Sequence, residues 1–410
     1  MARTSTTTSS LPRPVLLTSV GVLTTHVPLA AVTAALATHM KAGERDRLLP
    51  APFLVYLIIA LSLYMPTALR DVLRIVLAGL RWLTPARGPR LPVATKGAIS
   101  RARTRLGWEV LAMLYGQVAR PLATRQTRGA WYKRWRLVAL DGTSLALPYT
   151  AENETAFGNH ANKEGDGAFP LLKLAALVEV GTHAVLRVAF DACVVPEIVL
   201  AERVLAALGP GMLVLEDRGF VGYDWFRQVR STGAEVLCRL RVNRHFPVQR
   251  RLADGSFLSV LTPPAGSDGA PIPVRVIAYT LRGVPGGAAV YRLVTSLLAP
   301  TVAPARELAA LYHERWEAEG TFDEFKTHLR GGAAIRLRSK TPDLVRQEVY
   351  GLLLAHYVVR AVLHDAALQV DEDPDRLSFV HTVQVLRHTL PQAVAFPPAA
   401  ADAAVSTHVG

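Results

Sequence analysis

Long stretches without charge dominate the first part of the chain. Residues 14–40 and 51–69 contain no Asp, Glu, Lys or Arg, and the second includes the run FLVYLIIALSLYM. A stretch of about 20 apolar residues can span a membrane. However, Pro66 interrupts the second stretch, and the residues that follow it, DVLRIVLAGLRWL, have the spacing of an amphipathic helix. The pattern favours a helical domain whose apolar helices bury one another, with a membrane span as the alternative.

A proline- and glycine-rich break at residues 84–92 precedes a basic helix pair. Gly107 separates the two helices. Two short helices across a glycine turn are compatible with a helix-turn-helix element near residues 92–121. The alternative is an exposed basic pair in a small bundle. In a helix-turn-helix, the candidate DNA contacts would be Arg101, Arg103 and Arg105.

From residue 131 onward the pattern changes to one of strands. The apolar runs that predict strands are residues 135–148, 171–180, 183–195, 211–220 and 234–241. Helices are predicted at residues 196–208 and 223–231. Asp141 and Gly142 interrupt the first run, and a polar loop follows at residues 149–167. The series β-β-β-α-β-α-β indicates an α/β core, whose strand order the pattern does not fix.

Residues 243–300 alternate and are rich in turns, which predicts a separate small β-rich insertion. Two helices are predicted after it, at residues 311–329 and 339–368, and an Ala-rich tail follows Pro397. These patterns divide the chain into a helical domain at 1–125, a core at 126–242 and 301–345, the insertion at 243–300, and a C-terminal helix with a mobile tail at 346–410.

Composition indicates which class of molecule the protein binds. The net charge is +13 and arginine dominates the basic residues, a side chain suited to bidentate phosphate contacts. A polyanion is therefore the first expectation, although coding bias toward arginine also raises the charge. Cys193 and Cys238 lie in apolar runs without zinc-type spacing, which predicts core residues. No glycine-rich nucleotide motif occurs, so no nucleotide cofactor is expected.

Acidic residues mark the candidate chemistry. At about 100° per residue, one helical stripe roughly 60° wide would contain Tyr312, Arg315, Glu319 and Lys326. Alone, such a stripe is most simply a solvated face. Asp141 and Asp217, however, lie at the ends of buried-strand runs, where an unpaired carboxylate is costly. Three acids on three elements predict a divalent-metal site, with Asp191 as the competing acid.

Three motifs carry a family resemblance. They are DGT at residues 141–143 followed by LALP, DRGF at 217–220, and a Tyr-x2-Arg-x3-Glu-x6-Lys spacing in which all four residues of the helical stripe match. In these motifs the chain resembles the DDE transposases of the insertion-sequence-4 family. The likeness extends to the helical N-terminal region and to the long helix at 339–368.

The resemblance implies a ribonuclease-H-like catalytic core with a β-rich insertion, preceded by an all-helical N-terminal domain. It implies cut-and-paste transposition of an element bounded by inverted repeats. Asp141, Asp217 and Glu319 would be catalytic and bind two Mg²⁺ ions, with Mn²⁺ able to substitute. The implied partners are double-stranded DNA and a second copy of the chain in a dimeric synapse. A cytoplasmic, nucleoid-associated protein without a membrane segment is expected.

The resemblance also assigns phosphate contacts. Arg315 would fork onto a phosphate, Lys326 would act as a point charge, and Tyr312 would donate its hydroxyl hydrogen. Trp316 would stack on a base or lie in the core, and Arg218 would be a further phosphate contact. The family's hairpin step uses an aromatic residue of the insertion. No Trp lies between residues 243 and 300, so this step stays open.

Two other function classes remain as alternatives. A related ribonuclease-H-like nuclease, or a domesticated DNA-binding protein without strand transfer, would keep the fold and the basic surface. The presence of all three acids argues against simple inactivation. A membrane protein is the third reading, and it depends only on residues 51–69.

Overall fold

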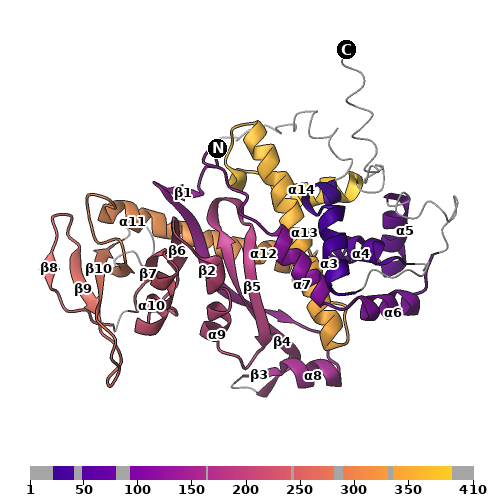
Figure 1. Cartoon of the computed structure of the whole chain (residues 1–410), viewed down its shortest axis with the longest axis horizontal. Helices are drawn as coiled ribbons and strands as arrows, with labels where there is room; N and C mark the ends of the chain where they lie inside the picture. Colours follow the sequence, from indigo (N-terminus) through magenta and orange to yellow (C-terminus); the bar gives the residue numbers. More distant parts are fainter. Residues whose placement is uncertain are drawn as a thin grey trace, which may run out of the picture.

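One large mixed sheet extends through the protein, with a group of helices packed beside it (Figure 1). The computed structural model describes residues 22–40, 49–79, 93–162, 165–241, 244–280, 290–330 and 336–389. The predicted break at 84–92 and the Ala-rich tail lie outside these residues.

Five strands form the centre of the sheet: β2 (Trp135–Ala146), β4 (Gly165–Glu179), β5 (Val185–Ala192), β6 (Met212–Glu216) and β7 (Glu235–Arg239). Their spatial order is β5-β4-β2-β6-β7. The first three strands pair antiparallel, whereas β2, β6 and β7 pair parallel. Each parallel step needs a crossover, and α9 (Glu197–Glu202) and α10 (Tyr223–Ser231) lie in these crossovers. This arrangement fixes the strand order that the sequence pattern left open.

The β-rich insertion extends the same sheet. Its strands are β8 (Arg250–Arg251), β9 (Phe257–Leu261), β10 (Ile272–Tyr279) and β11 (Tyr291–Thr295). β11 pairs antiparallel with β7, so the insertion covers what would otherwise be an open edge of the core. The predicted insertion thus contains strands, and it is continuous with the core sheet. The predicted loop at 149–167 differs from expectation, because it contains α8 (Ala151–Phe157) and β3 (Asn159–Asn162).

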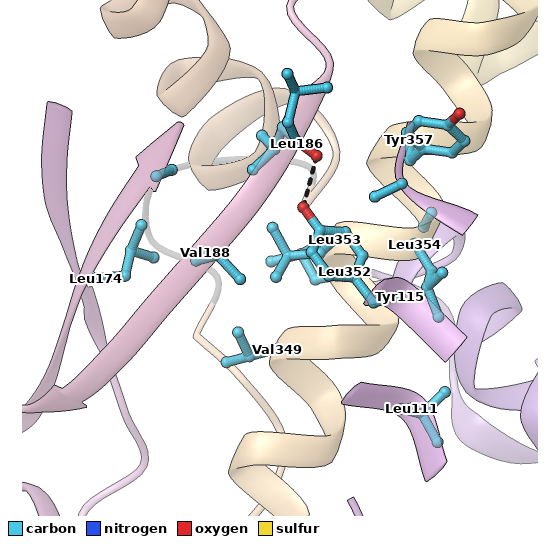
Figure 2. Close-up of a cluster of buried hydrophobic side chains, with 14 of the residues drawn as sticks. Leu111, Tyr115, Leu174, Leu186, Val188, Val349, Leu352, Leu353, Leu354 and Tyr357 are labelled. Atoms are coloured by element: carbon cyan, nitrogen blue, oxygen red, sulfur yellow. Dashed lines mark hydrogen bonds between the residues drawn. The ribbon is translucent and has the colours of Figure 1, made fainter. Parts of the chain in front are cut away.

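The helical part combines the two ends of the chain. Its N-terminal helices are α2 (Val22–His26), α3 (Leu29–Thr38), α4 (Ala51–Leu63), α5 (Leu69–Gly79), α6 (Lys96–Leu106) and α7 (Glu109–Val118). The C-terminal helices are α13 (Pro342–Gln369) and α14 (Phe379–Thr389). Figure 2 shows α13 and α7 against β5, where the Tyr115 hydroxyl donates to the Val185 carbonyl oxygen at 2.6 Å. The helices are thereby fixed to the sheet.

Burial explains the uncharged stretches. Every residue of α4 from Phe53 to Leu63 is buried, and the helix has 13 residues, about 20 Å at 1.5 Å per residue. Among the described helices, α13 is long and apolar enough to cross a membrane by length and composition, but 78% of its most apolar window is buried inside the protein. Both helices therefore have the burial of core helices.

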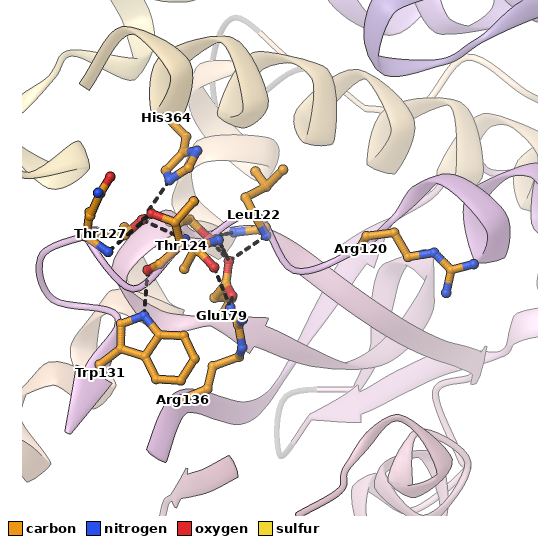
Figure 3. A network of polar contacts seen from close by, with 12 residues as sticks. Arg120, Leu122, Thr124, Thr127, Trp131, Arg136, Glu179 and His364 are labelled. Carbon is orange, nitrogen blue, oxygen red and sulfur yellow. Dashed lines mark hydrogen bonds and ion pairs between the residues drawn. The ribbon is translucent and has the colours of Figure 1, made fainter. Parts of the chain in front are cut away.

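A buried carboxylate joins the segment after α7 to the sheet (Figure 3). Glu179 of β4 accepts hydrogen bonds from the backbone amides of Leu122 and Ala123, at 2.9 and 2.8 Å. Its other partners are the Thr182 hydroxyl at 2.6 Å and the Arg136 guanidinium of β2. Because Glu179 is fully buried, these contacts compensate a charge that would otherwise be costly.

Candidate active site

Strand register places Asp141 and Asp217 side by side. The last pair of the parallel β2–β6 ladder joins Leu140 to Glu216, so the two aspartates are the next residues on both strands. Side chains alternate between faces of a sheet. The residues at every second position before the aspartates lie on the same face as they do. These residues are buried in one cluster with Tyr312, and they are Leu137, Ala139, Leu213 and Leu215. Both carboxylates therefore point toward the face that Tyr312 covers. The strand also runs through Asp141 without the predicted interruption.

The third acid comes from a segment that is helical but irregular. It consists of α11 (Ala305–Leu311), a 3-10 turn at Tyr312–Arg315, α12 (Trp316–Asp323) and a π turn at Glu324–His328. The predicted regular helix over 311–329 was therefore wrong in its geometry, because the turn type changes from α to 3-10, back to α and then to π.

Contacts from this segment nevertheless reach β2. The Arg315 guanidinium donates from Nη1 to Asp141 Oδ2 at 3.1 Å and from Nη2 to Glu319 Oε1 at 3.0 Å. The Lys326 ammonium donates to Thr143 Oγ1 at 2.7 Å. Asp141 and Thr143 are two residues apart on the strand, so they share a face. Three of the four predicted stripe residues therefore gather over one end of β2.

Several acids lie close to one buried cation, the Arg315 guanidinium. Burial raises the pKa of Asp141, while the Gly142 amide and the Arg315 guanidinium oppose that rise. Asp217 and Glu319 raise the same pKa because their negative charges are near. Arg315 is only 8% exposed, so its charge acts on the acids with little screening by solvent.

A fourth acid, Glu197, was missed by the sequence reading. It begins α9, and a Cβ atom on Gly142 would lie 2.3 Å from its Oε1 atom. The Glu197 carboxylate thus rests against the strand beside Asp141. Burial raises its pKa, and Asp141 and Asp217 raise it further. The glycine of the DGT motif was the available signal, since it leaves room for another side chain. Asp191 instead pairs with Arg203 at 2.7 Å.

The donor chemistry suits a hard divalent cation, because carboxylate oxygens are the ligands that Mg²⁺ prefers. Among the side chains that the structure describes, no group of three acids, histidines or cysteines is arranged to hold one ion. The acids nevertheless have the chemistry of ligands for such an ion. In this structure, the Arg315 guanidinium binds two of them, Asp141 and Glu319.

One further residue of the predicted site, Tyr312, differs from expectation. The Tyr312 hydroxyl donates to the backbone carbonyl of Glu216 at 3.0 Å, and the side chain is 5% exposed. The structure therefore uses it to fix the helical segment to β6, and the predicted phosphate contact is not presented. Arg218 is exposed beside Asp217. The side chain of Trp316 lies outside the described part of the structure.

Arg103 of the basic helix pair is not available for the predicted DNA contact. This side chain is buried, with Nε 2.8 Å from Gln347 Oε1 and Nη2 3.0 Å from Ser339 Oγ. It joins α6 to α13, so its prediction as a DNA contact was wrong. Arg101 and Arg105 are exposed. In a helix-turn-helix the second helix enters the groove, yet half of α7 is buried, in the contacts that fix it to the sheet and α13.

Comparisons with known proteins agree with the motifs. A family model described as a transposase DDE domain matches residues 134–358, and one described as insertion element 4 transposase N-terminal matches residues 17–116. The transposase InsG for insertion sequence element IS4 of Escherichia coli K12 is 28% identical over 77% of this chain and 70% of its own length. The putative transposase InsZ of the same organism is 24% identical over 54% of this chain and 68% of its own.

Among solved structures, the cryo-EM structure of a piggyBac transposase synaptic complex with hairpin DNA aligns with a TM-score of 0.45 and 12% identity. The alignment covers 92% of this chain and 80% of that one. The DDE-domain match spans more than half of the chain and contains Asp141, Asp217 and Glu319. The chain therefore belongs to the family of transposases with a DDE domain.

Proposed function

We propose that this transposase cleaves DNA at the inverted-repeat ends of its element and joins those ends to target DNA in a reaction that depends on Mg²⁺. Asp141, Asp217 and Glu319 are the catalytic acids of the proposal. One observation carries it: the two aspartates directly follow the last residue pair of the parallel β2–β6 ladder, and Arg315 links the first of them to Glu319.

When bound, two Mg²⁺ or Mn²⁺ ions would neutralise phosphate charge and activate a water or a 3′-hydroxyl group. The protein itself positions the three acids. Asp141 lies within a rigid strand and Asp217 directly follows one, whereas the Glu319 side chain is 47% exposed on a helix and is the least constrained of the three. If Arg315 releases one carboxylate to an entering cation, its guanidinium can take a phosphate oxygen instead. No protein nucleophile is needed.

The proposed partners follow from charge and family. A net charge of +13 favours a polyanion, and the substrate would be double-stranded DNA carrying the terminal repeats, followed by target DNA. Two copies of the chain would hold the two ends in one synapse. The protein would act in the cytoplasm, at the nucleoid.

A cleavage assay tests the catalytic assignment. A DNA fragment with the repeats that flank the gene is incubated with Mg²⁺ and with wild type, Asp141→Ala, Asp217→Ala or Glu319→Gln. Each variant should cleave at background level while keeping the wild-type circular dichroism spectrum. Asp191→Ala is the matched control and should cleave normally, because that acid pairs with Arg203. Full activity in any of the first three removes that residue from the site.

A further inference from the structure

Four arginines gather around the turn that follows Asp217. Arg218 lies in this turn, Arg239 ends β7, and Arg241 and Arg244 lie in the segment that leaves β7. Because β6 and β7 are parallel, their carboxyl ends meet at the same edge of the sheet, where open α/β sheets place ligands. We call Arg218, Arg239, Arg241 and Arg244 the arginine face.

Backbone contacts hold the arginine face against the turn. Arg241 donates from Nε to the Arg218 carbonyl oxygen at 3.3 Å, and Arg244 donates from Nη1 to the Val221 carbonyl oxygen at 2.5 Å. Carbonyl groups are neutral, so these bonds orient the guanidinium groups without cancelling their charge. The Cys238 thiol beside them donates to the Asp217 carbonyl oxygen at 2.9 Å. The face is therefore tied to the backbone of a proposed catalytic residue.

The described carboxylates form no ion pair with the arginine face, although Asp217 directly precedes Arg218. Within the described part of the chain, none lies in ion-pair range of the four arginines, whereas exposed arginines on the helical side of the protein, such as Arg74 and Arg376, do have acidic partners. Gathering like charges without a counter-ion costs free energy in the free protein. An anion on this face would remove that cost.

Aromatic rings continue the face onto the insertion. The Arg239 guanidinium carbon lies 4.9 Å from the centroid of the Tyr291 ring, and Tyr291 stacks on Tyr279 with centroids 5.6 Å apart. These two tyrosines are paired across β10 and β11. The surface thus extends from Asp217 across several strand ends, which is longer than one small anion requires.

We infer that the arginine face binds the phosphodiester backbone of the DNA that flanks the scissile phosphate on the side of the insertion. This inference rests on the proposed function, since it takes the DNA substrate from it. A polyanion fits better than a single phosphate because several fixed cations follow one another along the edge, and guanidinium groups suit successive phosphates. The insertion then acts as a second wall for the substrate.

Salt-dependent binding tests the inference. The probe is a fluorescent 30-base-pair duplex without inverted repeats, and its dissociation constant is measured by anisotropy across a series of KCl concentrations. Arg218→Gln/Arg241→Gln removes two exposed charges. The slope of log K against log [KCl] should become shallower by about 1.8, since each lost phosphate contact removes about 0.9. The matched control, Arg74→Gln/Arg376→Gln, loses the same net charge from ion-paired arginines and should keep the wild-type slope.

The outcomes separate two failures. An unchanged slope in Arg218→Gln/Arg241→Gln, or an equal change in the control, overturns the inference while wild-type cleavage leaves the proposed function intact. Absence of duplex binding and of cleavage by the wild type overturns both. Thermal unfolding of both variants at the wild-type temperature shows that the comparison concerns binding and not folding.

Discussion

Arg315 places one fixed positive charge between two acids. Its guanidinium donates to Asp141 and Glu319, and an arginine stays protonated at every pH at which the protein is folded. A divalent cation that binds the same carboxylates must therefore compete with it. Arg315 should therefore weaken metal binding, and it should also supply positive charge for a phosphate.

Replacing Arg315 separates these two effects. Arg315→Ala should bind Mn²⁺ more tightly than the wild type, because the competing charge is gone, while DNA cleavage should fall by about 100-fold or more, as for loss of a transition-state donor. Calorimetry measures the first quantity and the cleavage assay the second. Weaker Mn²⁺ binding would contradict the competition, and unchanged cleavage would make the arginine's match to the motif incidental.

Glu197 should tune the same acids. Glu197→Gln removes a carboxylate that lies against Gly142 and whose pKa is raised by burial and by the nearby Asp141 and Asp217. We expect Mn²⁺ affinity to fall by about tenfold, the lower range for groups next to metal ligands. Asp191→Asn is the isosteric control and should leave the calorimetric titration unchanged. Equal Mn²⁺ affinity of Glu197→Gln and wild type would show that Glu197 has no part in metal binding.

At the scale of the element, local sequence predicted where helices begin and end. Thr95 caps α6 by accepting from the Ala98 amide at 3.2 Å, and Gly107 ends it with a φ of 78°. Local sequence could not show which arginine of α6 is buried. That depends on α13, where Gln347 lies 244 residues further along the chain than Arg103. The same limit hid the π turn after α12, because its shape depends on contacts outside the segment.

Arg103 should therefore matter for stability. Arg103→Ala removes the guanidinium that donates to Gln347 Oε1 and Ser339 Oγ, and charged hydrogen bonds of this kind contribute about 1.5–3 kcal/mol each. We expect the free energy of unfolding in urea to fall by about 3 kcal/mol. Arg101→Ala, on the exposed side of α6, should change it by less than about 0.5 kcal/mol. Equal effects would contradict the assignment of Arg103 to the core.

Gly351 should be required where α13 meets α4. A Cβ atom at this position would lie 2.7 Å from Ile58 Cγ2 and 3.2 Å from the Ile58 carbonyl oxygen. Gly351→Ala should lower the free energy of unfolding by about 1–3 kcal/mol through overpacking, despite the higher helix propensity of alanine. Urea unfolding measures the loss. Adding Ile58→Val tests the contact, since that pair of changes should recover part of the stability.

At the scale of the whole molecule, the order of strands and helices followed from the sequence, and the three motifs identified the family. Two features did not. The insertion strand β11 joins β7 through residues more than 50 positions apart, such as Leu237 and Thr295, and no local pattern shows such a pairing. The second feature is a buried polar cluster around Glu324, an acid that the sequence reading passed over.

Glu324 connects three parts of the fold. It lies in the π turn after α12 and accepts from His183 Nδ1 at 2.9 Å, His356 Nε2 at 2.9 Å and Arg360 Nε at 2.7 Å. His183 belongs to the connection between β4 and β5, whereas His356 and Arg360 belong to α13. The sheet, the long core helix and the segment that carries Glu319 therefore share one buried carboxylate.

This cluster should make global stability sensitive to acid. Burial, together with the nearby His183, lowers the pKa of His356 from 6.5 to about 3. Between those two pH values the unfolded chain binds a proton at this histidine and the folded protein does not, so the free energy of unfolding falls as the pH falls from about 6.5 toward 3.

His356→Gln keeps a donor for Glu324 and removes the titration. Its urea midpoint should fall less steeply than that of the wild type between pH 7 and pH 5. Part of the slope should remain, because burial also holds the pKa of His183 well below its usual value. The difference between the two proteins cancels the contributions of all other acids and histidines. Identical slopes would mean that the pKa of His356 is the same in the folded and unfolded protein, and a shallower slope in the variant is therefore required. A steeper slope in the variant than in the wild type would mean that His356 is protonated in the folded protein and pairs with Glu324 as a cation.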